Sequence, residues 1–282
     1  MALQLTQALG RLAAPFTDAV GPLIICVAVF AALAWITKGR AKALIDARAA
    51  TAETRINAAV AVVDTLAIGP ALAIGMAALV GALASHGLQL DTVAIWSRLG
   101  RWPTVAVAVV LGDFLGYWRH RVQHSAWLWP AHAMHLSDTH LTWFSLGRMH
   151  PIDRAGSLLD MVILSALGMP VWALAANGVV RHYYGYFIHA DVPWTLGRAG
   201  WVMNSPVMHR WHHARDVEGS GYNFATVFSL WDRAFGTFYQ PGPCNVPTGV
   251  RENMGQGVLG QYAHPIKTWW EAIRPRRQQL SS

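Results

Sequence analysis

Charged side chains are scarce in this chain of 282 residues. Asp, Glu, Lys and Arg together make up 13% of the sequence, and hydrophobic residues make up 54%. A soluble domain usually carries about 25% charged residues, so this shortage indicates that much of the surface faces lipid. The net charge is +7, but the basic residues flank apolar stretches and do not form one stripe. A membrane is therefore favoured over nucleic acid as the binding surface.

Cysteine is nearly absent. The two cysteines, Cys26 and Cys244, provide neither a disulfide framework nor a Cys-x-x-Cys ligand pair. Cys26 lies inside an apolar run, where packing is its simplest role. Any metal that this chain binds must therefore rely on histidine, with aspartate or glutamate in support.

Apolar runs of the length of a membrane span are, by contrast, frequent. Residues 20–37 contain no charge and are about long enough to cross a bilayer. Residues 57–85 predict a second span with a kink at Pro70, and residues 103–118 predict a third. The third span leads directly to the first histidines of the main histidine-rich region.

Residues 155–189 form one more apolar block, which is interrupted at Gly168–Pro170. We expect a helical hairpin there, with short arms that are tilted or partly inserted. Basic residues follow the first span, so the positive-inside rule places residues 38–56 in the cytoplasm. The polar segment from Pro193 onward then forms a cytoplasmic cap, and the basic tail from Arg274 lies near anionic headgroups.

Histidine is concentrated in one third of the chain, since eleven of the thirteen histidines lie between positions 120 and 213. In a helix, residues spaced i, i+3 and i+4 project from one face. Imidazole is the commonest protein ligand for iron, copper and zinc, whereas packing would require buried partners for every ring nitrogen. We therefore predict a metal site, and its strongest candidates form three boxes: His120 and His124, His132 and His135, and His209, His212 and His213.

Several other histidines are weaker candidates. His140 lies one turn beyond the middle box, where a ligand and a surface residue are equally plausible. His189 ends the hairpin at the membrane exit and is a ligand candidate, whereas His182 fits an interfacial aromatic belt better. His150 is expected to pack beside the site without binding metal.

Asp113 precedes His120 by seven residues, which places both on one helical face two turns apart. An unpaired carboxylate in an apolar span is costly. A hydrogen bond from a ligating imidazole would satisfy it, and an ion pair with Arg119 or Arg121 is the alternative.

These strings together resemble the fatty acid hydroxylase (sterol desaturase) superfamily of membrane di-iron enzymes. The resemblance covers about residues 108–240 and includes the S-P-x-x-H-R-x-H-H and W-D-R-x-F-G-T strings. The matching segments are Asp113-Phe114, Tyr117 to His124, His132 to His135, Arg148 to Pro151, Ser205 to His213, Tyr222-Asn223 and Ser229 to Thr237.

The resemblance implies an all-α membrane bundle of about four crossing helices, or a hairpin among them, with a cytoplasmic helical cap that holds two irons. It divides the chain into a transmembrane region (1–102), a catalytic domain (103–240) and a cytoplasmic tail (241–282). Asp113 and Asn223 would support the metal ligands. The implied ligand set is His120, His124, His132, His135, His189, His209, His212 and His213.

One departure from the family pattern concerns the middle box, which is normally H-x-x-H-H. Its last position is Leu136 in this chain, and leucine cannot ligate a metal. Three alternatives remain open: His140 substitutes, one metal keeps an open position, or the second iron binds weakly. The spacing by itself fits iron, copper and zinc about equally, so iron is implied by the resemblance alone.

The implied activity is O2-dependent hydroxylation of an alkyl C–H bond of a lipid, in an inner membrane of bacterial type with the site facing the cytoplasm. The sequence contains no heme, flavin or nucleotide motif, so electrons must come from a separate ferredoxin- or cytochrome-type donor with its reductase. A desaturase with the same irons, a catalytically inactive homologue, and a non-catalytic metal-binding or transport protein are the alternatives. Transport is disfavoured because its ionisable residues should lie at the membrane midplane.

Overall fold

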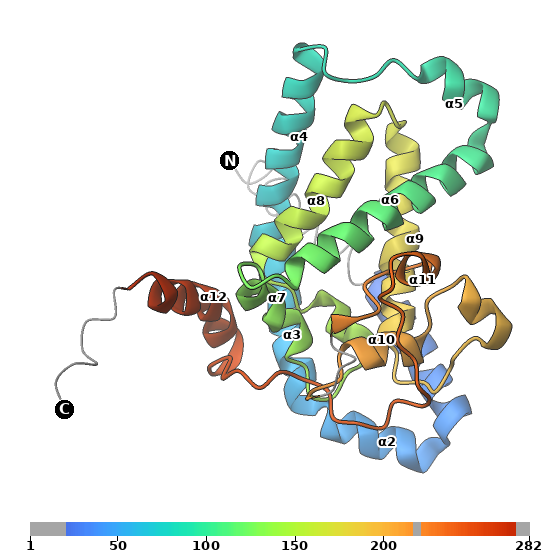
Figure 1. Ribbon diagram of the computed structural model, residues 1–282. Helices are drawn as coiled ribbons and strands as arrows, with labels where there is room; N and C mark the ends of the chain where they lie inside the picture. Colours follow the sequence, from blue (N-terminus) through green and yellow to red (C-terminus); the bar gives the residue numbers. More distant parts are fainter. Residues whose placement is uncertain (1–20, 217–220, 275–282) are drawn as a thin grey trace, which may run out of the picture.

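A computed structural model describes residues 21–216 and 221–274 of the chain (Figure 1). Within these residues the structure is helical, and its only β pairing is an isolated bridge between Ala214 and Thr248. The predicted all-α class is therefore confirmed. The basic tail that the sequence placed near headgroups continues from Arg274 outside the described residues.

Among the residues that the structure describes, two helices are long and apolar enough to cross a membrane. The first is Gly21–Lys38, and the second runs from Thr51 to Ser85 through α3 (Thr51–Val63), η1 (Asp64–Ile68) and α4 (Gly69–Ser85). Helix α2 (Arg40–Ala49) joins them and carries basic residues. No bend is recorded at Pro70, and the helix continues from Thr51 to Ser85. The irregularity nearest the expected kink is the π-helical turn η1, which ends two residues before this proline.

A third span exists only if α5 (Val93–Leu99) and α6 (Arg101–Gln123) are taken together. These helices are bent by 118° relative to each other, and the bend falls at Gly100. Residues 86–102, predicted to be a connector, therefore include one short helix. Helix α6 begins close to the predicted start of the third span and continues to the first histidine box.

The predicted hairpin is present as α8 (Pro151–Ala166) and α9 (Val171–His189), which meet at the end of the bundle farthest from the histidines (Figure 1). Its turn contains Gly168, whose φ is +72°, a conformation that L side chains rarely adopt. A Cβ atom there would lie 2.2 Å from the Leu90 carbonyl oxygen. Neither arm is among the candidate spans. Ala108, Leu164 and Ala173 form the apolar core between α6, α8 and α9.

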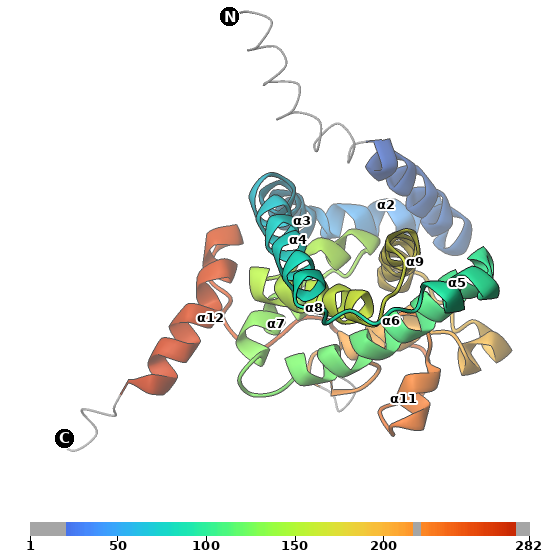
Figure 2. The same ribbon diagram turned by 90° about the horizontal axis from the view of Figure 1, so that it is seen from above.

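The remaining elements lie at the opposite end of this bundle, where α6 and α9 finish (Figures 1 and 2). Helix α12 extends sideways from the rest of the molecule (Figure 2). The elements at this end of the bundle are α7 (Trp129–Leu136), η2 (Trp143–Gly147), η3 (Gly197–Trp201), α10 (Pro206–His212), α11 (Leu230–Ala234) and α12 (Gly257–Ile273).

Candidate metal centre

The histidine boxes lie at helix ends that converge below the bundle. His120 is in the last turn of α6 and His124 caps that helix, while His189 is the last residue of α9. Helix α10 begins at Ser205, whose hydroxyl accepts a hydrogen bond from the Met208 backbone N–H at 3.2 Å. This N-cap, followed by proline, is a standard helix start, and it places the third box on one short helix.

Eight imidazoles gather into two groups of four. Within each group the candidate ligand atoms all lie within 4.8 Å of one another. Helix α7 contributes one histidine to each group, whereas the segment formed by α10 and its C-cap contributes one to the first group and two to the second. The first histidine group is His120, His124, His132 and His212, and the second histidine group is His135, His189, His209 and His213.

Ring nitrogens of the first histidine group face each other in an arrangement that fits a bound metal ion. His120 Nδ1 lies 2.7 Å from the Phe224 carbonyl oxygen, and His132 Nδ1 lies 3.1 Å from a carboxylate oxygen of Asp153. Both oxygens accept, so both Nδ1 atoms carry the proton and both Nε2 atoms carry a lone pair. These two Nε2 atoms are 3.0 Å apart. Two lone pairs cannot bond to each other, whereas a metal ion accepts both.

The second histidine group repeats this arrangement. His135 Nδ1 donates to the Arg148 carbonyl oxygen at 3.2 Å, and His189 Nδ1 donates to the Gly185 carbonyl oxygen at 2.7 Å. Their Nε2 atoms therefore carry lone pairs, and they face each other at 3.3 Å. His209 Nε2 lies 3.0 Å from His189 Nε2. In each group, two Nε2 atoms with lone pairs therefore face each other: His120 and His132 in the first, and His135 and His189 in the second.

Four further ring nitrogens are buried without any hydrogen-bond partner among the described residues: His124 Nε2, His209 Nδ1, His212 Nε2 and His213 Nδ1. A buried polar atom left unpaired costs about 1–3 kcal/mol, and native structures rarely leave several together. Metal coordination would satisfy His124 Nε2 and His212 Nε2 of the first group, so these residues fit a metal ion.

Burial keeps the imidazoles of α10 and its C-cap neutral. Desolvation, followed by the effect of nearby His132, lowers the pKa of His212 to about 3. Desolvation and neighbouring histidines also hold the pKa of His209 and of His213 well below the ordinary value. Neutral imidazole is the form that binds metal, so no proton has to be displaced from these rings near neutral pH.

The family comparison agrees with this geometry. The sequence model described as fatty acid hydroxylase matches residues 105–237, which include all eight histidines. Residues 105–237, slightly less than half of the chain, are therefore similar to a fatty acid hydroxylase domain. No solved structure matches the chain significantly.

Curated proteins that are similar to this chain carry related names. The chain is 30% identical over 172 residues to the ornithine lipid hydroxylase OlsE of Rhizobium tropici, covering 59% of this chain and 52% of that protein. It is 28% identical over 188 residues to the human alkylglycerol monooxygenase, covering 66% and 38%. It is 27% identical over 163 residues to the Delta(7)-sterol 5(6)-desaturase erg32 of Schizosaccharomyces pombe, covering 56% and 47%. The matches thus span about half, or less, of each relative.

The carboxylate that contacts the first histidine group is Asp153, a residue that the sequence analysis missed. Asp153 lies in the first turn of α8 and is 2% exposed. One of its oxygens contacts His132 Nδ1, and the other accepts from Gln123 Nε2 at 2.9 Å. Its position just after the His150-Pro151 helix start was the available signal, because a carboxylate is favoured in a first turn.

Asp113 and Asn223 have other contacts than those expected. Asp113 accepts hydrogen bonds from the backbone N–H groups of Val227 and Phe228 and lies 3.6 Å from the Arg181 guanidinium, with no hydrogen bond to a histidine. Asp113 therefore pairs neither with an imidazole nor with Arg119 or Arg121, the partners that the sequence analysis considered. Asn223 donates from its Nδ2 to the Met208 carbonyl oxygen and the Tyr239 carbonyl oxygen. Both residues fix backbone segments beside the histidines and do not touch the rings.

The structure does not bring His140 to either histidine group. Its side chain is exposed, and its Nδ1 lies 3.1 Å from the Thr139 hydroxyl. Leu136 is buried, with 2% of its surface exposed. His150 caps α8 by accepting from the Ile152 N–H, while His182 packs against Tyr186, with ring centroids 4.4 Å apart. None of these four residues is part of either group.

Two cavities reach the histidines from different directions. A cavity of about 60 Å3 reaches histidines of both groups and has its apolar wall at Leu146, Met149 and Ile188. A second cavity, of about 200 Å3, lies between Trp129, Leu136 and the pair His212 and His213. It also contacts Arg251 and Glu252, which are exposed. The first cavity therefore combines an apolar wall with the polar side chains of Arg119, Gln123 and Asp153, whereas the second has charged, exposed residues along it.

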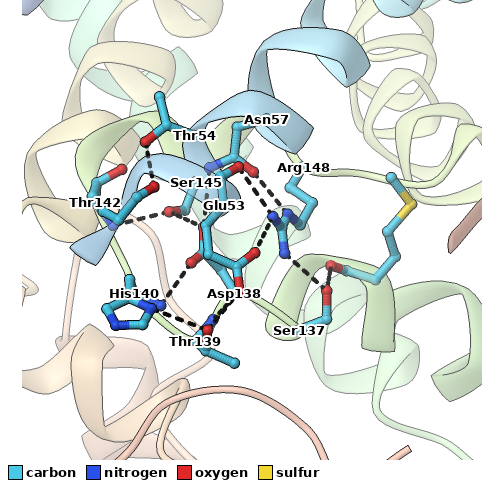
Figure 3. A network of polar contacts seen from close by, with 12 residues as sticks. Glu53, Thr54, Asn57, Ser137, Asp138, Thr139, His140, Thr142, Ser145 and Arg148 are labelled. Atoms are coloured by element: carbon cyan, nitrogen blue, oxygen red, sulfur yellow. Dashed lines mark hydrogen bonds and ion pairs between the residues drawn. The ribbon is translucent and has the colours of Figure 1, made fainter. Parts of the chain in front are cut away.

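A buried polar network ties the second histidine group to α3, outside the matched domain (Figure 3). The Arg148 side chain is fully buried and donates to Glu53 Oε2 at 2.5 Å and to Asn57 Oδ1 at 2.7 Å. Asn57 in turn donates to Asp138 at 3.0 Å. Since the Arg148 carbonyl oxygen accepts from His135, the network holds that ring in place from behind.

Proposed function

We propose that this protein is a membrane-bound di-iron oxygenase that hydroxylates an alkyl C–H bond of a lipid with O2. The observation that carries the proposal is the pair of four-histidine groups whose Nε2 lone pairs face each other. The family match and the names of the relatives, which include a lipid hydroxylase and monooxygenases, support it. The alternative of a non-catalytic metal-binding protein has no such support.

The histidine groups would each hold one iron, and the pair of irons would supply the activation of O2 that no side chain can provide. One oxygen atom enters the C–H bond and the other leaves as water, so two electrons and two protons per turnover come from outside the chain. We infer a separate ferredoxin- or cytochrome-type donor with its reductase. The polar second cavity, which reaches His212 and His213, is the nearer approach for such a donor.

The protein's own residues would position the lipid and exclude water. Leu146, Met149 and Ile188 form an apolar wall next to histidines of both groups, and such a wall presents an alkyl carbon without competing polar contacts. Gly185 keeps this wall close, because a Cβ atom there would lie 3.0 Å from the methyl groups of Leu146. The substrate would enter from the lipid side, with the histidine groups facing the cytoplasm of an inner membrane.

Two measurements test the proposal. The purified chain, reconstituted anaerobically, should bind two irons, and fewer than one iron per chain would refute di-iron chemistry. Lipid extracts of cells with and without the protein should differ by the gain of one oxygen in one lipid class. A loss of two hydrogens would instead identify a desaturase with the same site, the alternative for which erg32 is a named relative.

A further inference from the structure

Helix α12 carries an apolar stripe that the described chain leaves exposed. Its residues are Leu259, Ile266, Trp270 and Ile273. They are separated by seven, four and three positions, a spacing that places them on one face of a helix. Gln261 and Pro265 are buried and mark a different, packed side of the helix. The exposed fractions in the stripe are 83% for Leu259, 66% for Ile266, 54% for Trp270 and 63% for Ile273.

The stripe is held in a fixed orientation because α12 is anchored along its packed side. Val258 and Tyr262 pack against Val60 of α3 and Met134 of α7. Farther along, Trp269 Nε1 donates to the Trp127 carbonyl oxygen at 2.8 Å. The helix is therefore attached near both ends, and rotation cannot bury the stripe against its own chain.

The anchor lies where the long helix α3–η1–α4 changes from charged to apolar. Asp64 pairs with Arg154 at 2.8 Å, and from Thr65 to Ser85 there is no charged residue. At 1.5 Å per residue that stretch is about 30 Å long, which equals the thickness of the hydrocarbon core. Asp64 thus marks the edge of the membrane. Tyr262 of α12 lies near this level, since it packs against Val60, which is about one helical turn before Asp64.

From this level α12 runs sideways, across the direction of α3 and α4 (Figures 1 and 2). A helix that leaves a spanning helix at the membrane edge and runs across it lies along the membrane surface. Trp127, which is 72% exposed, and Trp270 lie on this part of the molecule. Tryptophan is enriched at the headgroup level of membranes.

The charges beside the stripe match a lipid surface. Lys267 and Arg274 are exposed on the same helix, and the sequence continues with Arg276 and Arg277. Basic side chains next to an apolar stripe are typical of helices that lie in the interface of membranes with anionic lipid. A second copy of this helix seated on the same face would instead bring like charges together.

We propose that α12 is an interfacial membrane helix, whose stripe of Leu259, Ile266, Trp270 and Ile273 is inserted between the headgroups and the acyl chains. This anchor would be separate from the spanning helices. Because α12 packs on α7, which carries His132 and His135, the membrane contact sets the height of the histidine groups above the lipid. The proposal does not depend on which reaction the histidine groups perform.

Spin labels on the full-length protein test the insertion directly. In a background with Cys26→Ser and Cys244→Ser, a label is attached at Ile266→Cys in the stripe. Glu271→Cys, on a polar side of the same helix, is the matched control. The protein is placed in nanodiscs of phosphatidylcholine and phosphatidylglycerol, and the collision rates of each label with O2 and with a water-soluble nickel chelate are compared. Leu259→Cys provides an independent second position in the stripe.

We expect the labels at positions 266 and 259 to collide more often with O2 than with the nickel chelate, and the label at position 271 to show the reverse order. Nickel collisions in excess at both stripe positions would place the stripe in water and overturn the proposal. Exclusion of both reagents, with spin–spin broadening that vanishes on dilution by unlabelled protein, would overturn it in favour of a second copy. Gel filtration and metal content, unchanged from the parent, confirm that each variant is folded.

Discussion

Replacing Asp153 by asparagine should weaken metal binding by the first histidine group while leaving the second group intact. The Asp153 carboxylate is 2% exposed and lies 3.1 Å from His132 Nδ1. Asparagine keeps an oxygen that can accept from His132 or Gln123 but removes the negative charge that makes the imidazole a stronger donor. Loss of such a partner typically costs 10- to 100-fold in metal affinity, which corresponds to about 1.4–2.7 kcal/mol.

The assay is anaerobic titration of the apoprotein with Fe2+ against a competing chelator, together with metal analysis after gel filtration. We expect the wild-type chain to retain two metals and Asp153→Asn to retain one at the same chelator concentration. Asp160→Asn is the control, because Asp160 is also buried on α8 but pairs with Arg119 and contacts no histidine. Equal affinities for Asp153→Asn and the wild type, or equal losses in both variants, would refute the reasoning.

Three further variants test other parts of the structure. His212→Ala should lower metal content and His140→Ala should not, as measured by metal analysis, since the structure brings only His212 to a histidine group. Gly116→Ala should lower the midpoint of thermal unfolding, with a cost of about 1–3 kcal/mol, because its Cβ would meet Arg181 Nη2 at 1.9 Å. Arg148→Ala should lower the free energy of chemical unfolding by about 3–5 kcal/mol, because it leaves the carboxylate of Glu53 in α3 without its partner. Unchanged unfolding of either variant would contradict the packing described.

The sequence predicted which histidines would lie close together, but not how they would divide between two groups. Helical spacing placed His132 and His135 on one face of one helix, and the natural expectation is that one box serves one metal. The structure sends them to different groups. That division depends on how α6, α9 and α10 approach α7, which is a matter of tertiary packing that no local pattern contains.

The error over Asp113 has a simple physical cause. Seven residues bring two side chains to one face of a helix, but they also separate them by about 10 Å along its axis. A hydrogen bond requires about 3 Å, so Asp113 could not reach His120 in a straight helix. Asp153, distant in sequence, reaches the site because α8 packs against α6 and α7. Helical spacing shows which side chains lie on the same face of one helix. The hydrogen bonds to the imidazole rings, however, come from side chains on neighbouring helices.

Leu136 is the position at which this chain departs from the family pattern, and the geometry argues that the departure does not remove a metal site. The second histidine group already contains four convergent imidazoles without a contribution from position 136, and Leu136 lies beside the cavity that reaches His212 and His213. Of the three alternatives, an open coordination position therefore fits best, because four nitrogen ligands leave room on an iron that binds six. The wild-type chain should consequently retain two irons of comparable affinity. Retention of a single iron under conditions that saturate the first group would contradict this argument and favour weak binding at the second.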